Sequence, residues 1–509
     1  MAEPPERLDV LIVGGGLSGV GAACRLELGR PGTTYAVLES RDTIGGTWDL
    51  FRYPGIRSDS DMHTLGYPFR PWLDGEALAD GPAILQYVQD TADELAVTPH
   101  VRLHHRVVAA DWSSAEARWT VEVLRTDTGD TVTLTCRFLF SCTGYYRYDH
   151  GHEPEIEGRE DFRGEVVHPQ LWPADLDVRG TRVVVIGSGA TAITLVPALA
   201  GTALHVVMLQ RSPTYVVSLP SRDVVADLVR HVLPPASAYK VVRRKNIATS
   251  GLSYRLSRRW PDRMAKVLVN GVRRQLPEGY DVATHFTPRY GPWTQRLCVV
   301  PDGDLFAAIS AGTASVVTDR VVRFTPTGLL LESGQELDAD VVVTATGLEL
   351  LLVGGMELRV DGVLVDAPTT VAYKGMMLTG VPNFAFAIGY TNASWTLKCD
   401  LVSRYVCRLL DHLDAHGYAS VVADPPTDPE RLPLLDLSAG YVRRALDGLP
   451  KQGTRPPWRL LQNYRQDVRL LTKGPVTDEA TRFTTRAMKS PAGRGLRPPS
   501  PGGGPAHVA

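Results

Sequence analysis

The sequence lacks several features that would assign it to a specialised class of protein. Its six cysteines include no CxxC pair and no group with histidine at metal-ligand spacing, so we expect reduced thiols and no metal site. Lysine and arginine number 54 and aspartate and glutamate 56, and the net charge of -2 gives no overall attraction to nucleic acid. No run of about 18 apolar residues is present, which predicts no membrane-spanning helix. The N-terminus does not resemble a signal peptide either, so we expect a cytoplasmic protein.

The length and composition are those of a large globular protein. The chain has 509 residues, of which 44% are hydrophobic and 22% charged. These values exclude bulk disorder, collagen-like repeats and coiled coil. At about 150 residues per domain, the length favours roughly three folding units.

Two segments of the chain follow the pattern strand, glycine turn, helix, strand. The first has a β-rich run at Leu8–Val13, a helix-compatible stretch to about Gly29 and a second β-rich run at Tyr35–Glu39. The second has strands at Arg182–Ile186 and His205–Arg211, with a glycine turn and a helix between them. Each segment is typical of a βαβ unit in a parallel sheet. The sequence therefore predicts two nucleotide sites.

The first glycine turn predicts a site for FAD or NAD. Gly14, Gly16 and Gly19 form GxGxxG between a strand and a helix, where glycine lets the backbone approach a pyrophosphate. Glu39 ends the next strand, and a carboxylate at this position accepts hydrogen bonds from both ribose hydroxyls. Because it also repels a 2'-phosphate, we do not expect NADP here.

The second glycine turn predicts a site for NADPH. It reads GSGATA and includes Gly187, Gly189 and Thr191, with alanine in place of the third glycine. The next strand ends in Arg211 and Ser212 instead of an acidic residue. A guanidinium beside a hydroxyl suits a 2'-phosphate. The first site suits a nucleotide with free ribose hydroxyls, and the second suits one with a 2'-phosphate. Together they indicate a bound flavin that NADPH reduces.

Three further segments complete the organisation of the chain. The β-rich region between the two units predicts a small antiparallel insert. Residues 222–274 are helix-like and hold 13 Lys or Arg against three Asp, an excess of 13 - 3 = +10. This segment is either a solvated helical subdomain or a surface that contacts an anionic membrane or attracts an anionic cofactor. Residues 490–509 are rich in Pro and Gly and predict a disordered tail.

The loop after Glu39 separates the remaining flavoprotein classes. It contains no redox-active cysteine pair, which argues against a disulfide reductase. It reads RDTIGGTWDLFRYPGIRSDSD, in which Gly46 and Trp48 could place backbone and an aromatic plane against a flavin. Arg57, Asp59 and Asp61 add charges farther along. The alternative for the same residues is a polar surface loop.

Several motifs resemble one enzyme family. GGTWDLFRYPGIRSDSD is similar to the flavin-proximal loop of class B flavoprotein monooxygenases. FRGEVVHPQLWP matches the type I Baeyer-Villiger fingerprint FxGxxxHxxxW(P/D) through Phe162, Gly164, His168, Trp172 and Pro173. HFTPRYGPWTQRLCVVPDGDLF, VVTATGLELLLVGG and LPKQGTRPPWRLLQNY resemble the ethionamide-activating subgroup. The resemblance extends from about Leu8 to Phe483.

The resemblance implies an NADPH- and O2-dependent FAD monooxygenase. In this family, reduced FAD adds O2 at its C4a carbon, and the peroxyflavin inserts one oxygen atom next to a ketone carbonyl to give an ester or lactone. It also implies sulfoxidation of a thioether or thioamide. One alternative is a flavin monooxygenase that oxygenates only sulfur or nitrogen. A more distant one is an NADPH-binding redox protein that inserts no oxygen. We expect a small-molecule substrate and no nucleic-acid partner.

The resemblance also implies roles for individual residues. Arg296 would be the catalytic cation, and Asp59 would orient it. FAD would be approached by the backbone or side chains of Gly46, Thr47, Trp48, Asp59, Thr346 and Gly347. His168 would be a structural or hinge residue more readily than a proton carrier, and Asn392 and Trp395 would line the active site.

The predicted fold class is α/β, with two dinucleotide-binding Rossmann-like domains, for FAD and NADP, and an inserted helical subdomain. The expected FAD domain spans residues 1–145 and 375–489. The expected NADP domain spans 146–217 and 290–374, and the helical subdomain spans 218–289.

Overall fold

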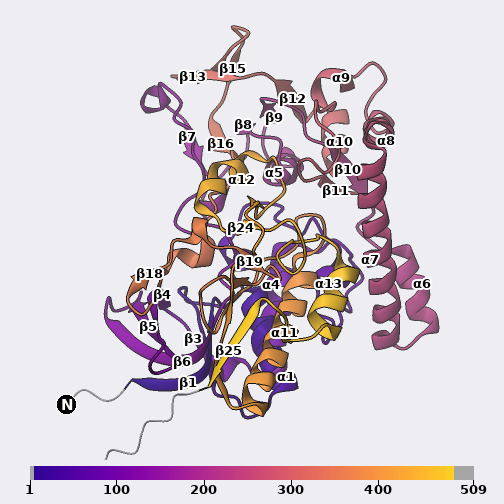
Figure 1. The fold of residues 1–509 in the computed structure, drawn as a ribbon. Coiled ribbons are helices and arrows are strands. Elements are labelled where there is room, and N and C mark those ends of the chain that lie inside the picture. The colour runs from indigo at the N-terminus through magenta and orange to yellow at the C-terminus, as the bar shows by residue number, and fades with distance from the viewer. Residues whose placement is uncertain (1–4, 486–509) are drawn as a thin grey trace, which may run out of the picture.

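The computed structural model describes residues 5–485, and its two largest β-sheets each contain one of the predicted βαβ units (Figure 1). The tail expected at 490–509 lies outside the described residues. In Figure 1 the two sheets lie at opposite ends of the molecule, and a group of long helices stands along one side.

The first sheet combines a parallel half with an antiparallel half. Its strands follow the order β18 (Val363–Leu364), β17 (Glu357–Val360), β4 (His105–Ser113), β5 (Arg118–Arg125), β6 (Thr131–Ser141), β1 (Glu6–Val13), β2 (Tyr35–Leu38) and β3 (Val101–Arg102), with β21 (Phe384–Phe386) also on β6. Strands β21, β6, β1, β2 and β3 run parallel. Strands β4, β5 and β6 pair antiparallel, which confirms the predicted insert.

The alternation of side chains along β1 places a core on each face of this sheet. Val10 and Ile12 pack in a cluster with α1 (Leu17–Gly29), α4 (Gly81–Glu94) and α11 (Trp395–Ala415). Leu11 and Val13 face the opposite cluster, which contains Trp112 of β4. The sheet is therefore covered on both sides, as parallel strands require.

The second sheet is entirely parallel. Its order is β12 (Ala314–Thr318), β9 (His205–Gln210), β8 (Arg182–Ile186), β16 (Val341–Thr344) and β7 (Glu165–Val167). Helices α5 (Ala190–Ala200) and α10 (Asp304–Ser310) pack together in its core cluster. The antiparallel strands β13 (Val321–Thr325), β14 (Gly328–Leu331) and β15 (Glu336–Asp338) form an adjoining sheet.

The segment predicted to be helical and basic forms three helices, α6 (Val224–Val232), α7 (Pro235–Arg259) and α8 (Pro261–Arg273). It leaves the second unit after β10 (Val216–Leu219) and returns before β11 (Cys298–Pro301), and these two strands pair parallel. Helix α7 is held against the first unit by Arg243, whose guanidinium donates to the carbonyls of His63 and Gly66 at 2.6 and 2.8 Å. The helices thus connect the two units.

The remaining elements are short and complete the first unit and the connections. The helices are α2 (Thr47–Leu50), α3 (Met62–Leu65), α9 (Val282–His285), α12 (Gly440–Ala445) and α13 (Tyr464–Val468). The strand pairs are β19 (Ala372–Tyr373) with β20 (Met377–Leu378), β22 (Tyr418–Ala423) with β25 (Thr481–Thr485), and β23 (Leu432–Pro433) with β24 (Lys451–Gln452).

The chain returns to the first sheet earlier than the expected boundary at residue 375. Strand β17 pairs parallel with β4, so residues 357–364 belong to the first sheet. A two-residue strand such as β18 carries little sequence signal. It pairs with the adjacent strand β17, and the other partner of β17, β4, lies about 250 residues earlier in the chain. We propose that the chain divides into domains as expected from the sequence, except that residues 357–364 belong to the first unit.

Candidate active site

One large cavity lies between the two units and reaches both glycine turns. Its volume is about 1280 Å³, above the range of about 300–1000 Å³ that is common for a single small ligand. It lies where strands of both sheets end, which is where parallel α/β sheets bind ligands. The predicted site residues in its lining are Gly14, Gly16, Glu39, Gly46, Thr47, Trp48, Asp59, Gly187, Gly189, Thr191, Arg211, Ser212, Arg296, Thr346 and Gly347.

The first glycine turn brings strand β1 and helix α1 into very close contact. Gly14 has a φ of +104°, which L side chains rarely adopt. A Cβ atom on Gly19 would lie 1.8 Å from the carbonyl oxygen of Gly14, so only glycine fits there. Gly19 therefore supports the turn from behind instead of lining the cavity. Helix α1 has no side-chain cap and no acidic residue in its first turn, which leaves its N–H groups available for an anion.

Glu39 lies directly after β2, beside this turn. It is only 4% exposed, and its Oε2 accepts a hydrogen bond from the Gly15 N–H at 2.7 Å. No basic side chain pairs with it among residues 5–485, and its carboxylate retains acceptor capacity towards the cavity. An uncapped helix terminus and a carboxylate without a cationic partner in the described chain fit the pyrophosphate and ribose of FAD.

The second glycine turn has the same construction with different chemistry at its strand end. Gly187 has a φ of +141°, and a Cβ atom there would lie 2.4 Å from the Ala345 carbonyl oxygen. A Cβ on Gly189 would meet no atom within 4 Å, and α5 begins beside it without a side-chain cap. Arg211 and Ser212 follow β9, line the cavity and are exposed. Within the described chain Arg211 pairs with no carboxylate, so its charge is available to a phosphate.

Arg296 and Asp59 form a two-pronged ion pair inside the cavity. The Arg296 Nε lies 2.9 Å from one carboxylate oxygen of Asp59, and its Nη2 donates to the other at 3.0 Å. Both side chains are half-buried, with 35% and 28% exposed. The nearby carboxylate raises the pKa of Arg296 above its ordinary value, so the guanidinium is always charged. The predicted pair is therefore assembled from residues 237 positions apart.

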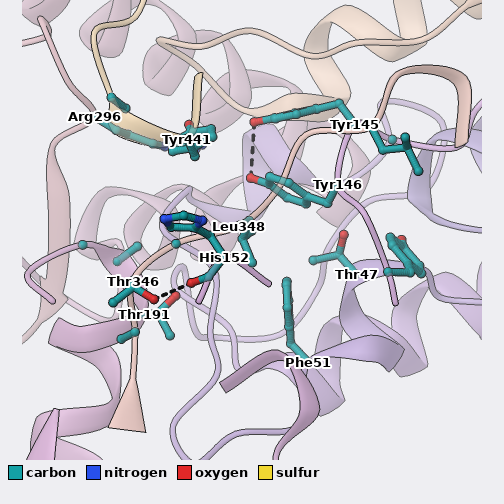
Figure 2. Close-up of a pocket in the computed structure, with 18 of the residues that line it drawn as sticks. Thr47, Phe51, Tyr145, Tyr146, His152, Thr191, Arg296, Thr346, Leu348 and Tyr441 are labelled. Carbon is teal, nitrogen blue, oxygen red and sulfur yellow. Dashed lines mark hydrogen bonds between the residues drawn. The ribbon is translucent and has the colours of Figure 1, made fainter. Parts of the chain in front are cut away.

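Three tyrosines that the sequence analysis did not identify surround this pair. Figure 2 shows Tyr145, Tyr146 and Tyr441 gathered near Arg296. The hydroxyls of Tyr145 and Tyr146 lie 3.2 Å apart, and the Tyr145 ring stacks on Trp395 at a centroid distance of 4.9 Å. Burial raises the pKa of each tyrosine well above its ordinary value, so all three hydroxyls stay neutral.

The position of two of these tyrosines could have been anticipated. Tyr145 and Tyr146 follow β6, whose end lies beside the glycine turn of β1 at the ligand-binding edge of the sheet. Tyr441 belongs to α12, far along the chain, and no local pattern marks it. The structure also places Trp395 in the lining, as expected, but not Asn392, whose amide nitrogen donates to the Gln462 carbonyl at 3.0 Å.

The fingerprint residues lie behind the cavity and not in its lining. Phe162 packs against Phe324 in the core of the second unit. A Cβ atom on Gly164 would lie 2.3 Å from the Asp340 carbonyl oxygen. Trp172 is half-buried against the cluster around α5. These three positions serve packing of the second unit.

His168 connects the fingerprint segment to the cavity wall. Its Nδ1 accepts from the Gln170 N–H at 3.2 Å, and its Nε2 lies 3.3 Å from the Gly347 carbonyl. Burial lowers its pKa below the ordinary value, consistent with a neutral ring that accepts at one nitrogen and donates at the other. Next to Gly347, the Thr346 hydroxyl donates to the carbonyl of His152 (Figure 2). His152 is a further lining residue that the sequence analysis did not identify.

Comparison with known proteins shows similarity to flavin-dependent monooxygenases. The model of a family described as flavin-binding monooxygenase-like matches residues 78–353, and that of an NAD(P)-binding Rossmann-like domain matches residues 12–74. The chain is 56% identical over 483 residues to the FAD-containing monooxygenase EthA of Mycobacterium tuberculosis (strain ATCC 25618 / H37Rv), covering 94% of this chain and 98% of that protein. It is 52% identical to EthA of Mycolicibacterium smegmatis (strain ATCC 700084 / mc(2)155), with 94% and 97% covered.

The fold is also that of solved monooxygenase structures. Oxidized steroid monooxygenase bound to NADP superposes with a TM-score of 0.75 at 23% identity, covering 94% of this chain and all of that one. An OTEMO complex with FAD and NADP superposes with a TM-score of 0.71 at 21% identity and the same coverage. The predicted resemblance, fold class and cofactors FAD and NADPH are confirmed. The chain belongs to the flavin-binding monooxygenase-like family.

Proposed function

We propose that this NADPH-dependent FAD monooxygenase inserts one oxygen atom next to a ketone carbonyl, giving an ester or lactone, and also oxygenates the sulfur of thioethers or thioamides. The observation that carries the proposal is the permanently charged guanidinium of Arg296, held by Asp59 between the two nucleotide turns. Bound FAD supplies the redox chemistry, because it takes electrons from NADPH and activates O2.

The positive charge of Arg296 suits the proposed reaction. Addition of an anionic oxygen to a ketone moves negative charge onto the carbonyl oxygen. A fixed cation in a site that excludes water stabilises that charge without reorganising in the transition state. The two contacts that Arg296 makes with the Asp59 carboxylate fix the plane of the guanidinium, so its position does not depend on the substrate.

The aromatic side chains around Arg296 support the same proposal. Tyr145, Tyr146, Tyr441 and Trp395 present large apolar surfaces, and their burial keeps the tyrosine hydroxyls neutral. Such a wall removes water from the reacting groups around Arg296. We propose that these rings also contact the substrate.

We propose that the first glycine turn, Glu39 and the backbone around Gly46, Thr47 and Trp48 hold FAD. The second glycine turn with Thr191, Arg211 and Ser212 would hold NADPH. Thr346 and Gly347 lie between the two sets, at the end of β16. The bond from His168 to Gly347 supports a positioning role for the fingerprint segment, which would couple movement of the second unit to this part of the wall.

The proposed reaction can be tested by following the oxygen atom. The purified holoenzyme would be incubated with NADPH, isotopically labelled O2 and a panel of linear, cyclic and aromatic ketones and of thioethers. We expect one labelled oxygen in an ester or lactone and one in a sulfoxide. Labelled sulfoxide with no ester from any ketone would establish a heteroatom monooxygenase instead. Consumption of NADPH with all reducing equivalents recovered as hydrogen peroxide would overturn oxygen insertion altogether.

Replacing Arg211 with alanine tests the assignment of the second nucleotide site. The substitution removes a charged hydrogen bond to the 2'-phosphate, so we expect KM for NADPH to rise about 10- to 100-fold. NADH lacks that phosphate, and its KM should not change. Steady-state kinetics with both cofactors measures the effect.

Arg179→Ala is the matched control, because Arg179 is an exposed arginine of the same unit that does not line the cavity. It should leave both KM values unchanged, and Arg211→Lys should lie between the wild type and Arg211→Ala. An equal rise in KM for NADH and NADPH in Arg211→Ala would contradict recognition of the 2'-phosphate.

A further inference from the structure

Helix α6 carries an apolar face that points away from the protein. Val224, Val225, Leu228 and Val232 lie within an arc of about 100° on the helix, given the helical periodicity. Their exposed fractions are 74%, 46%, 67% and 75%. In Figure 1, α6 lies at the edge of the molecule on the outer side of α7. We call these four residues the α6 apolar face.

The polar side of α6 is the side that holds it to the protein. Arg230 donates to the Asp74 carbonyl at 2.9 Å, and Ala226 is buried. Asp223 caps the N-terminus of α6 and also binds Lys245 of α7 at 2.6 Å. The contacts that fix the helix therefore turn its apolar face outward, the reverse of an ordinary surface helix.

The helices beside α6 carry exposed positive charge. Of the 13 basic residues between 222 and 274, only Arg230 and Lys245 pair with a carboxylate within the described chain. Several basic side chains of these helices are exposed and form no ion pair or side-chain hydrogen bond within the described chain. They include Lys240, Arg244 and Arg258 of α7, Arg263 and Lys266 of α8, and Arg274, which follows α8. The partner of this surface must accept both apolar side chains and a high density of cations.

We propose that the α6 apolar face docks on an anionic lipid bilayer. The valine and leucine side chains enter the boundary between headgroups and acyl chains, and the cations of α7 and α8 contact anionic headgroups. Among residues 5–485, no helix combines the length and apolar character needed to cross a bilayer. The contact is therefore one along the membrane surface.

The charge distribution favours a bilayer over a second copy of the chain. A twofold interface brings the same surface of both copies together. Two segments that each carry an excess of +10 would then face one another and repel. Anionic lipid, in contrast, neutralises these cations and covers the apolar face at the same time.

Sedimentation with lipid vesicles tests the proposal with the full-length holoenzyme. We expect binding at low salt to vesicles of phosphatidylglycerol and phosphatidylcholine, and about tenfold weaker binding to phosphatidylcholine alone. The variant V224S/L228S/V232S removes most of the apolar area that enters the membrane, so its affinity for the mixed vesicles should fall about tenfold or more. These side chains are exposed, so the variant should keep its FAD and its activity in solution.

The control variant V322S/V363S/L364S removes three other exposed apolar side chains, on β13 and β18. It should bind the mixed vesicles like the wild type. A wild type that stays in the supernatant, or a V224S/L228S/V232S variant that binds as tightly as the control, would overturn the proposal. So would sedimentation velocity that finds a dimer which only V224S/L228S/V232S dissociates, because the apolar face would then be a self-association surface.

Discussion

Replacing Arg296 with alanine is expected to lower product formation about 100- to 1000-fold, the usual cost of removing a preorganised electrostatic donor. The protein should still purify with FAD, because the residues that we propose hold FAD, the first glycine turn and Glu39 among them, do not include Arg296. NADPH should still reduce the flavin at close to the wild-type rate. Electrons would then leave as hydrogen peroxide, which makes the ratio of peroxide to product the decisive measurement.

Two further variants distinguish the effect of the positive charge of Arg296 from the effect of its position. Arg296→Lys keeps a cation but loses the fork that binds both oxygens of Asp59, so its activity should lie between those of Arg296→Ala and the wild type. Asp59→Asn keeps the size of its side chain but releases Arg296, and it should lose activity without losing FAD. Ester or sulfoxide formation by Arg296→Ala at more than a tenth of the wild-type rate would contradict the catalytic role of Arg296.

Replacing Gly19 with alanine is expected to produce a protein without FAD. The new Cβ would lie 1.8 Å from the Gly14 carbonyl oxygen, a backbone atom that cannot move without breaking the turn. Overpacking of this kind costs about 1–3 kcal/mol or more, and here it also displaces the N–H groups that face the pyrophosphate. The ratio of flavin to protein absorbance after purification and the midpoint of thermal unfolding measure the two consequences.

The same helix provides the control. A Cβ on Gly29, at the end of α1, meets no atom within 4 Å, so Gly29→Ala should retain full FAD content. Its stability should not fall, because alanine is favoured over glycine within a helix by about 0.5–1 kcal/mol. If Gly19→Ala purifies with stoichiometric FAD and an unchanged unfolding midpoint, the close contact with Gly14 is not needed for binding.

The parts of the fold that were predicted from the sequence are those governed by neighbouring residues. The strand expected at Arg182–Ile186 has those limits in the structure, and the first helix ends at Gly29 as expected. A glycine turn between a buried strand and a helix has a local sequence signal, because it depends on φ angles and on contacts such as that between Gly14 and Gly19. The return of β17 and β18 to the first sheet was not predicted, because β17 joins that sheet by pairing with β4, about 250 residues earlier in the chain.

The residues of the candidate site also differ in whether the sequence alone indicated them. Glu39 and Arg211 follow their glycine turns at a spacing that the βαβ unit fixes, so the sequence alone indicated which nucleotide each site prefers. The resemblance to a family, and not any spacing, indicated Arg296 and Asp59. Tyr441 had neither kind of signal, since it reaches Arg296 from a short helix of the first unit.

The sequence by itself determined the two nucleotide turns, the basic helical segment and the family. The tertiary structure decided how these parts face each other. It joined Arg296 to Asp59 across the cavity, placed the fingerprint behind the wall and turned the apolar side of α6 outward. The physical reason is that helix and turn signals depend on local backbone preferences. Which face of a helix is buried, and which distant charges meet, depends on the packing of the whole chain.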